Sequence, residues 1–270
     1  MDLFGKDMII GDFRLSDFGF MLGSFELTNG EEELGMDYNT IEQYIGHNPV
    51  PIYLGAKYSN KLKPQATIIK NPKVNKTNPY FSEHECREVL RKLTGFDSYR
   101  TMQIYLDEFD EFYQFNVRIT SVNYRKIGAY IGAIILHLEC DSPFAWSNEF
   151  RYSYNLTPEK PLVFVNTSDD LNNYLLPKFI ISPHSSTSNL SIVNITDNNY
   201  TTSIKNISEN EIITMDSKNK ILQSSIQSRI ILNDFNLHFI RFISGRNELS
   251  VNIDCNISFS FQLPRKVGFL

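Results

Sequence analysis

Apolar and polar side chains alternate along much of this 270-residue chain. The clearest case is the segment 113–120, in which every second residue is apolar: Tyr113, Phe115, Val117 and Ile119. This alternation predicts a strand with one buried and one solvated face. Residues Tyr130–Cys140 are apolar on both faces and predict a more deeply buried strand. The segments 249–254 and 257–263 alternate in the same way, and the polar tetrapeptide Ser244–Asn247 before them predicts a turn. A mainly β protein is therefore expected.

One segment, 82–94, has the pattern of an α-helix instead. Ser82 and Glu85 have the spacing of a capping box, in which each satisfies a backbone N–H group near the other. The residues that follow form one apolar stripe at helical spacing: Cys86, Val89, Leu90 and Leu93. Arg91 and Lys92 suit the last turn, and Gly95 is a natural stop. We predict one helix, near residues 82–94, in an otherwise β-rich chain.

The organisation of the chain changes near residue 150. Residues 1–150 hold the predicted helix and the long strands, with 15 Lys and Arg against 21 Asp and Glu. Residues 151–270 carry 11 against 10, and their short apolar segments are separated by polar turns, such as 182–189 and 216–219. Short strands with regular turns are typical of a β-sandwich. We therefore predict two domains, 1–150 and 151–270, joined at Ser147–Pro161.

The composition favours strands and excludes several classes of function. The 20 Phe and 14 Tyr suit half-buried β surfaces. A formal net charge of −5 provides no basic surface for nucleic acid, so no sequence-specific binding of nucleic acid is predicted. No apolar run reaches the length of a membrane span, and the first residues lack the pattern of a secretory signal. Neither membrane insertion nor secretion is expected.

No residue is predicted to be catalytic or to bind a cofactor or a metal ion. The three cysteines are widely spaced and are expected to be free thiols: Cys86, Cys140 and Cys255. The five histidines are scattered, and each is expected on the surface or packed: His47, His84, His137, His184 and His238. His84-Glu85 matches a zinc-protease helix for two residues only, because the second His is absent. We predict that the protein is not an enzyme; a wall hydrolase that uses two distant carboxylates stays an alternative, without a marked pair.

The densest acidic cluster is the segment Asp107–Glu111. Several carboxylates together could bind calcium, but the segment lacks the Gly turn and the ligand spacing of an EF-hand. It also lies between two strand-like segments, 102–106 and 112–119. The solvated tip of a hairpin is the favoured interpretation.

The second half could also bind sugars, as a carbohydrate-binding module or an adhesion protein that recognises host cell-wall glycans. A sugar site usually needs an exposed aromatic ring, and the one Trp, Trp146, precedes this domain. The candidate rings that remain are Tyr152, Tyr154, Tyr174 and Tyr200. Packing of these tyrosines at the edges of the sandwich is the favoured alternative.

The order of these features resembles the distal tail proteins of siphophages, over nearly the whole chain. The resemblance implies that the N-terminal domain is a β-sandwich or split-barrel-like domain with one α-helix. In that family this domain has a helix like that at 83–93, then a strand pair like that through 113–118 and a buried strand ending like Leu138–Phe144. Its C-terminal galectin-like sandwich is similar, in order, to the segments 176–181, 190–194, 211–216 and 243–249. The last of these includes a Gly-x-Asn turn, Gly245-Arg246-Asn247, although the family often has Pro where this chain has Ser244.

The resemblance implies a structural component of the virion, made in the host cytoplasm and placed at the distal end of the tail. The implied assembly is a homo-hexameric ring that joins the tail tube to the baseplate or adhesion apparatus and leaves a central channel for DNA. Its partners would be further copies of itself, the tail tube protein, the tail lysin or fibre hub protein, and a receptor-binding protein. Residues 1–150 would form the ring and residues 151–270 would face outward. Because residues 1–150 carry a formal charge of −6, we further predict a channel wall that repels the DNA backbone.

Overall fold

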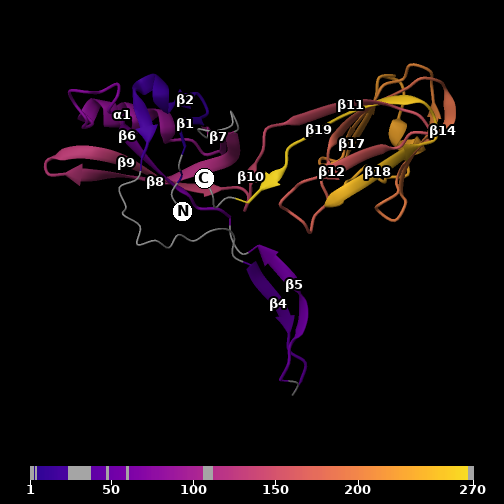
Figure 1. Ribbon diagram of the computed structural model, residues 1–270, viewed down its shortest axis with the longest axis horizontal. Helices are drawn as coiled ribbons and strands as arrows, with labels where there is room; N and C mark the ends of the chain where they lie inside the picture. The colour runs from indigo at the N-terminus through magenta and orange to yellow at the C-terminus, as the bar shows by residue number, and fades with distance from the viewer. Residues whose placement is uncertain are drawn as a thin grey trace. The chain divides into compact units, whose positions relative to one another are not determined.

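The computed structural model describes residues 3, 5–23, 38–46, 49–58, 61–105 and 112–266 (Figure 1). The chain is mainly β, which confirms the predicted fold class. It divides into two compact units, Met1–Asn148 with Arg265–Leu270, and Glu149–Pro264. The division lies two residues before the predicted boundary. The assignment of the last residues to the first unit was not predicted.

The strands of the first unit form one large sheet and a separate two-stranded ribbon. The large sheet has the order β2-β1-β7-β8-β9-β6-β3, and β10 and β20 pair at its side. Its strands are β1 (Asp7–Ile10), β2 (Phe13–Arg14), β3 (Phe20–Leu22), β6 (Gln65–Lys70), β7 (Arg100–Tyr105), β8 (Phe112–Ile127), β9 (Tyr130–Cys140), β10 (Ala145–Trp146) and β20 (Pro264–Arg265). A short 3-10 helix, η1 (Leu15–Phe18), connects β2 to β3. The apolar faces of these strands enclose one core, which includes Phe115, Ile104 and Leu136.

The long hairpin of β8 and β9 confirms the two strands that the alternation predicts. Phe115 and Val117 are buried, while Arg118 and Thr120 are exposed, as expected for a strand with one wet face. In β9 the residues from Gly132 to Cys140 are buried or half-buried, which agrees with its apolar character on both faces. β8 pairs with β7 through Phe112–Val117 and with β9 through Val117–Ile127, all antiparallel.

The predicted helix is α1 (Glu83–Leu93), the one α-helix in the part of the chain that the structure describes. Ser82 is its N-cap, and both hydrogen bonds of the capping box form: Glu85 N–H to Ser82 Oγ, 3.3 Å, and Ser82 N–H to Glu85 Oε2, 2.8 Å. Val89 and Leu93 are buried in the core. Leu90 differs from the expectation, since it is exposed although it belongs to the same apolar stripe.

A buried lysine joins α1 to the sheet. Lys70, the last residue of β6, is only 7% exposed, and its Nζ lies 2.8 Å from Glu85 Oε1. Glu85 thus serves both the helix cap and an ion pair. Its pKa lies below the usual range: burial, the largest influence, raises it, but hydrogen bonds from Lys70 and Ser82 and the charge of Lys70 outweigh burial.

Replacing Glu85 by Gln is expected to lower the free energy of unfolding near pH 7 by roughly 1 kcal/mol, because it removes the carboxylate that pairs with Lys70. The loss is small because Glu85 is partly exposed. A carboxyl group whose pKa is depressed by folding stabilises the protein above its unfolded pKa, about 4.3, and this stability is lost as pH falls through the folded pKa. The stabilities of the wild type and of Glu85→Gln should therefore converge in acid. Denaturant unfolding at several pH values measures this. A difference in the free energy of unfolding that stays constant down to about pH 3 would contradict this prediction. The control is Glu88→Gln, which removes only the exposed ion pair with Arg91.

The second unit is a sandwich of two antiparallel sheets around one core. One sheet has the order β11-β19-β13-β16-β17 and the other β12-β18-β14-β15. The strands are β11 (Phe150–Leu156), β12 (Leu162–Asn166), β13 (Lys178–Pro183), β14 (Thr187–Asn194), β15 (Tyr200–Ile207), β16 (Ile213–Asp216), β17 (Ile221–Ser224), β18 (Gly245–Val251) and β19 (Cys255–Phe261), with a 3-10 helix, η2 (Ile231–Asp234). The centre of the core is aromatic: Phe164, Phe179, Phe242 and Phe259 lie with ring centroids 4.7–5.9 Å apart.

Two local predictions for this half need correction. The expected turn Ser244–Asn247 is the beginning of a strand, because Gly245, Arg246 and Asn247 belong to β18 and pair with β12. Gly245 has φ of +82°, so the chain still needs glycine where it enters the strand. The expected junction Ser147–Pro161 does contain the division between the units, after Asn148, but much of it is strand and not linker, because β11 pairs with β19 over its whole length. Polar character misled both predictions, because each segment has one solvated face.

Candidate functional site

A two-stranded ribbon in the first unit is the most exposed apolar feature of the described residues. It is formed by β4 (Tyr38–Gln43) and β5 (Ile52–Tyr58), which pair only with each other within this part of the chain. The pairing shifts between Ile41 and Glu42, so that Leu54 becomes the extra residue of a bulge beside Gly55, whose φ is +137°. A bulge of this kind increases the twist of a ribbon. The ribbon was not predicted from the sequence.

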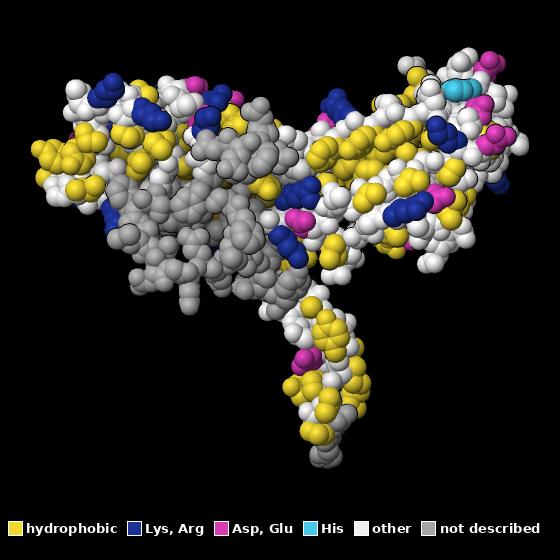
Figure 2. Space-filling model, viewed as in Figure 1, with side chains coloured by type: hydrophobic (Ala, Val, Ile, Leu, Met, Phe, Trp, Pro, Cys, Tyr) yellow, Lys and Arg dark blue, Asp and Glu magenta, His cyan; other side chains and the backbone are white. Residues whose placement is uncertain are grey.

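The side chains of the ribbon are exposed in spite of their apolar character (Figure 2). Between 39 and 58, none of the described side chains is buried. Tyr53 is 64% exposed and Leu54 58%. The exposed large apolar residues of the ribbon and its connection are Ile41, Tyr44, Ile45, Val50, Ile52, Tyr53 and Leu54. At the base of β5, the ring of Tyr58 packs edge-on against Phe144, with centroids 4.8 Å apart.

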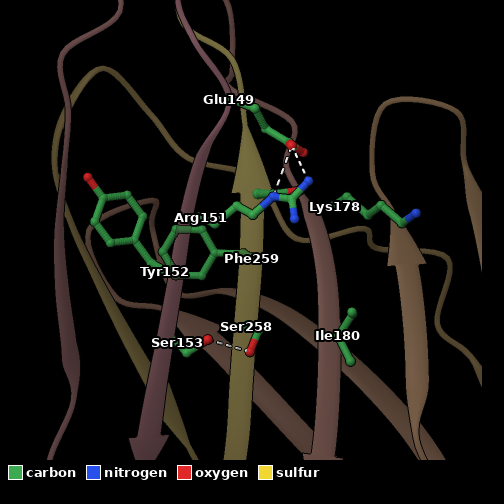
Figure 3. A pocket seen from close by; sticks show the side chains of 9 residues that line it. Glu149, Arg151, Tyr152, Ser153, Lys178, Ile180, Ser258 and Phe259 are labelled. Atoms are coloured by element: carbon green, nitrogen blue, oxygen red, sulfur yellow. Dashed lines mark hydrogen bonds and ion pairs between the residues drawn. The ribbon is translucent and has the colours of Figure 1, made fainter.

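A shallow groove of about 320 Å³, lined by both polar and apolar side chains, lies on the outer face of the second unit (Figure 3). Strand register explains its shape. Ser258 and Ser260 of β19 form the floor, because Ser260 lies between two long side chains on the neighbouring strands and Ser258 has a longer neighbour on β13. Ser260 is flanked by Arg151 of β11 and Lys178 of β13, and Ser258 is flanked by Ser153 and Ile180.

The polar groups of the groove are held by one another. Arg151 donates to Glu149 Oε2 from Nε at 2.9 Å and from Nη2 at 2.6 Å. The hydroxyl groups of Ser153 and Ser258 are 2.7 Å apart (Figure 3). The pKa of Glu149 is lowered by the hydrogen bond from Arg151 first, and then by Ser260 and the charge of Lys178. Glu149 is therefore an ionised acceptor, and the groove offers hydroxyl groups, cations and a carboxylate together.

Of the tyrosines considered as sugar platforms, Tyr152 lines this groove and is 37% exposed, but its ring also packs within the sandwich. The ring of Tyr152 packs against the core residues Phe259 and Phe261, with centroids 5.6 and 6.0 Å apart. Tyr154 also stacks on Phe259. The guanidinium of Arg241 lies over the rings of both Tyr174 and Tyr200, at 3.9 and 3.8 Å from the ring centres, and is held by Asp197 at 2.6 Å. These rings therefore have partners within the sandwich.

The candidate metal ligands lie apart from one another. No group of three His, Cys, Asp or Glu side chains that could hold a metal ion occurs among the described residues. His84 is exposed on α1, His137 contacts Asn123, His184 contacts Asn256, and His238 stacks on Tyr200. His47 and the acidic segment Asp107–Glu111 lie outside the described residues. The strands that flank the acidic segment, β7 and β8, pair antiparallel.

The three cysteines are free, as predicted: Cys86, Cys140 and Cys255. Burial raises the pKa of Cys140 and Cys255 to about 12, with smaller contributions from neighbouring carboxylates. Both thiols are therefore protonated and unreactive near neutral pH. Within the described part of the chain, no helix is long and apolar enough to cross a membrane.

Two family models match the chain over nearly all of its length. One, described as a phage tail protein N-terminal domain, matches residues 4–142, and the other, described as a phage tail C-terminal domain, matches residues 144–261. No curated protein matches the sequence.

Solved structures show a similar fold. The crystal structure of the Dit protein of phage SPP1, described as a paradigm of the hub adsorption apparatus in phages that infect Gram-positive bacteria, matches with 12% identity and a TM-score of 0.66, covering 95% of this chain and 98% of that one. Chains of the phage P2 baseplate in its activated conformation match more weakly. The structure with Ca matches with 10% identity and a TM-score of 0.43, covering 99% of this chain and 100% of that one. The structure with Sr matches with 9% identity and a TM-score of 0.45, covering 98% of this chain and 99% of that one.

Proposed function

This chain belongs to the family of phage tail proteins, and we propose that it forms a homo-hexameric ring at the distal end of the tail. Its location in the virion tail and a structural role there follow from the family. The ring, the six-fold count and the central channel for DNA are what the resemblance to distal tail proteins implies. The fold shared with the SPP1 hub protein supports a place in the hub. In the proposed assembly, the first unit forms the ring between the tail tube and the tail lysin or fibre hub protein. The second unit provides the docking surface for a receptor-binding protein.

The exposed ribbon β4–β5 carries this proposal. A two-stranded hairpin is at best marginally stable in water unless it packs against something else. Covering a large apolar side chain stabilises a protein by roughly 1.5–3 kcal/mol, so a ribbon with several such residues has a strong tendency to be covered. In a homo-oligomer a neighbouring copy of the chain can cover the ribbon, so no other protein is required.

A closed ring requires two different surfaces on each subunit: one binds the preceding subunit and the other binds the next. The far half of β8, from Arg118 to Ile127, provides the second surface. Its segment 118–124 pairs with β9 and with no other described strand, so we infer that the opposite edge of this segment can receive a further strand. Tyr124 and Ile127 are exposed along this half of β8. We infer that the ribbon of one subunit covers this edge of the next.

Charging the ribbon tests the ring. Ile52→Lys with Leu54→Lys is expected to convert a closed hexamer into monomers, because the buried ribbon would then hold two unpaired cations. Light scattering after size exclusion measures the mass, with 31.3 kDa for one chain, and negative-stain microscopy shows rings. Val163→Lys with Val165→Lys is the matched control, since both valines are exposed on β12 of the second unit. A wild type that stays monomeric at high concentration, or a charged ribbon that still forms rings, would contradict the proposal.

The channel wall can be tested in the same particles. We propose that it is neutral or acidic, on the basis of the formal charge of −6 on residues 1–150. DNA would then pass without binding, since nucleic-acid affinity depends on contacts between Lys or Arg and phosphate. A high-resolution structure of the ring in which Lys and Arg line the channel would overturn this part.

A further inference from the structure

The groove of the second unit has no role in the proposed ring, and its chemistry indicates a ligand of its own. We propose that the groove over β11, β19 and β13 binds a short, uncharged saccharide. Ser258 and Ser260 form the floor of the site. The other lining residues are Glu149, Arg151, Tyr152, Ser153, Lys178, Ile180 and Phe259.

The size of the groove sets the size of the ligand. Its volume, about 320 Å³, is at the lower end of the range for small-molecule sites, roughly 300–1,000 Å³. It is open to solvent along the sheet, so a chain of sugars can continue beyond it. A mono- or disaccharide unit of a longer glycan therefore fits better than a large ligand.

The hydrogen-bonding groups match the hydroxyl groups of a sugar. Each sugar hydroxyl can both donate and accept, and the groove offers groups of both kinds within one small area. The carboxylate of Glu149 accepts, the guanidinium of Arg151 donates, and Ser258 can do either. Because Glu149 and Arg151 already hold each other in position, the two are preorganised for a ligand that contacts both.

The charge balance decides between a neutral and an anionic ligand. Arg151 is engaged at two of its nitrogen atoms by Glu149, and the charge of Lys178 acts on Glu149 and on Asp216, its pairing partner on β16. A phosphate would have to displace these carboxylates or approach them closely. A neutral polyhydroxyl ligand uses the same groups without that repulsion.

Ile180 provides the apolar contact that sugar rings need. It is 45% exposed on the same face as Ser258, its register partner on β19. The C–H face of a sugar ring can pack on such a side chain while its hydroxyl groups reach the serines and Glu149. The contact area of Ile is smaller than that of an aromatic ring, so we expect weak affinity that is strengthened by several copies in an assembly.

Calorimetric titration of the full chain with glucose, galactose, N-acetylglucosamine and their β-linked disaccharides tests the site, with inorganic phosphate as the anionic probe. Ser258→Tyr, which fills the floor, is expected to weaken binding at least about tenfold, and Glu149→Gln about tenfold, because a hydrogen bond to a charged acceptor is lost. Val163→Tyr, on the exposed face of the other sheet, should bind as the wild type does.

Thermal unfolding and the oligomer mass of each variant are measured beside the titrations, so that a folding defect or a lost ring is seen separately. Glu149→Gln keeps the shape of the side chain and stays informative if Ser258→Tyr fails to fold. The proposal is overturned if no saccharide binds the wild type, if phosphate binds and saccharides do not, or if both groove variants bind as the wild type does.

Discussion

Replacing Glu211 by Ala is expected to destabilise the second unit by about 3 kcal/mol. The side chain of Glu211 is fully buried, and it forms an ion pair with Arg229, which is itself only 12% exposed. Glu211 also accepts hydrogen bonds from Ser224 Oγ at 2.5 Å and from Ser208 N–H at 3.0 Å. The substitution leaves a buried guanidinium with Asp234 as its remaining carboxylate, and it leaves two donors without their acceptor.

Denaturant unfolding monitored by far-UV circular dichroism gives this difference in free energy. The matched control is Glu248→Ala, which removes the acidic partner of Arg246 in an exposed ion pair of the same unit. Exposed pairs contribute about 0–1 kcal/mol, so the control should change little. If both variants lost the same stability, burial of the pair would not be the reason. A double substitution, Glu211→Leu with Arg229→Met, should recover part of the loss, because it removes the unpaired charge.

Replacing Asn247 by Ala is expected to cost about 3 kcal/mol of stability. This side chain is completely buried and makes four hydrogen bonds. Its oxygen accepts from Ile243 N–H at 2.9 Å and from Asn194 Nδ2 at 3.0 Å. Its nitrogen donates to the carbonyl groups of Ile243 and Gly245 at 2.9 and 3.0 Å. The amide therefore holds the chain in place where it enters β18.

The replacement Asn247→Asp tests the geometry more sharply. It keeps the two accepted bonds, but it turns the donor nitrogen into an oxygen that faces two carbonyl groups, and it buries a charge. We expect a larger loss than with Ala, and a loss that becomes smaller in acid, where the carboxyl group is protonated and can donate. Thermal unfolding at several pH values measures both. Asn155→Ala, on the exposed face of β11, is the control and should have little effect. A loss with Asp that equals that with Ala would show that the donated bonds contribute nothing.

Predictions from local pattern succeeded where the local pattern decides the structure. The capping box of Ser82 and Glu85 depends on residues three apart, so it can be read before any tertiary contact is known. The same is true of β8, whose alternation reports which face is buried, and of β9, whose apolar residues on both faces predict deeper burial. Leu90 shows where this reasoning fails. It belongs to the apolar stripe of α1 but is exposed, because the surface that buries Val89 and Leu93 does not extend over it.

The candidate surfaces could not be found in this way. The groove depends on short side chains of β19 lying between Arg151 and Lys178, which are on strands that are distant in sequence. A serine in a strand gives no sign of the length of its neighbours across the sheet. The ribbon was missed for a different reason: its apolar residues predict burial, and nothing in 38–58 says that no described part of the chain covers them.

The sequence by itself determined that the protein is mainly β, that a helix lies near residues 82–94, and that the organisation changes near residue 150. These properties follow from periodicity and capping, which act over a few residues. Only the tertiary structure decided that β11 lies in the expected junction, that Asn247 is a buried amide within β18 rather than part of a turn, and that Glu211 pairs with Arg229. Those outcomes depend on register and on which strands become neighbours, and the free energy that selects them comes from contacts between residues far apart in the chain.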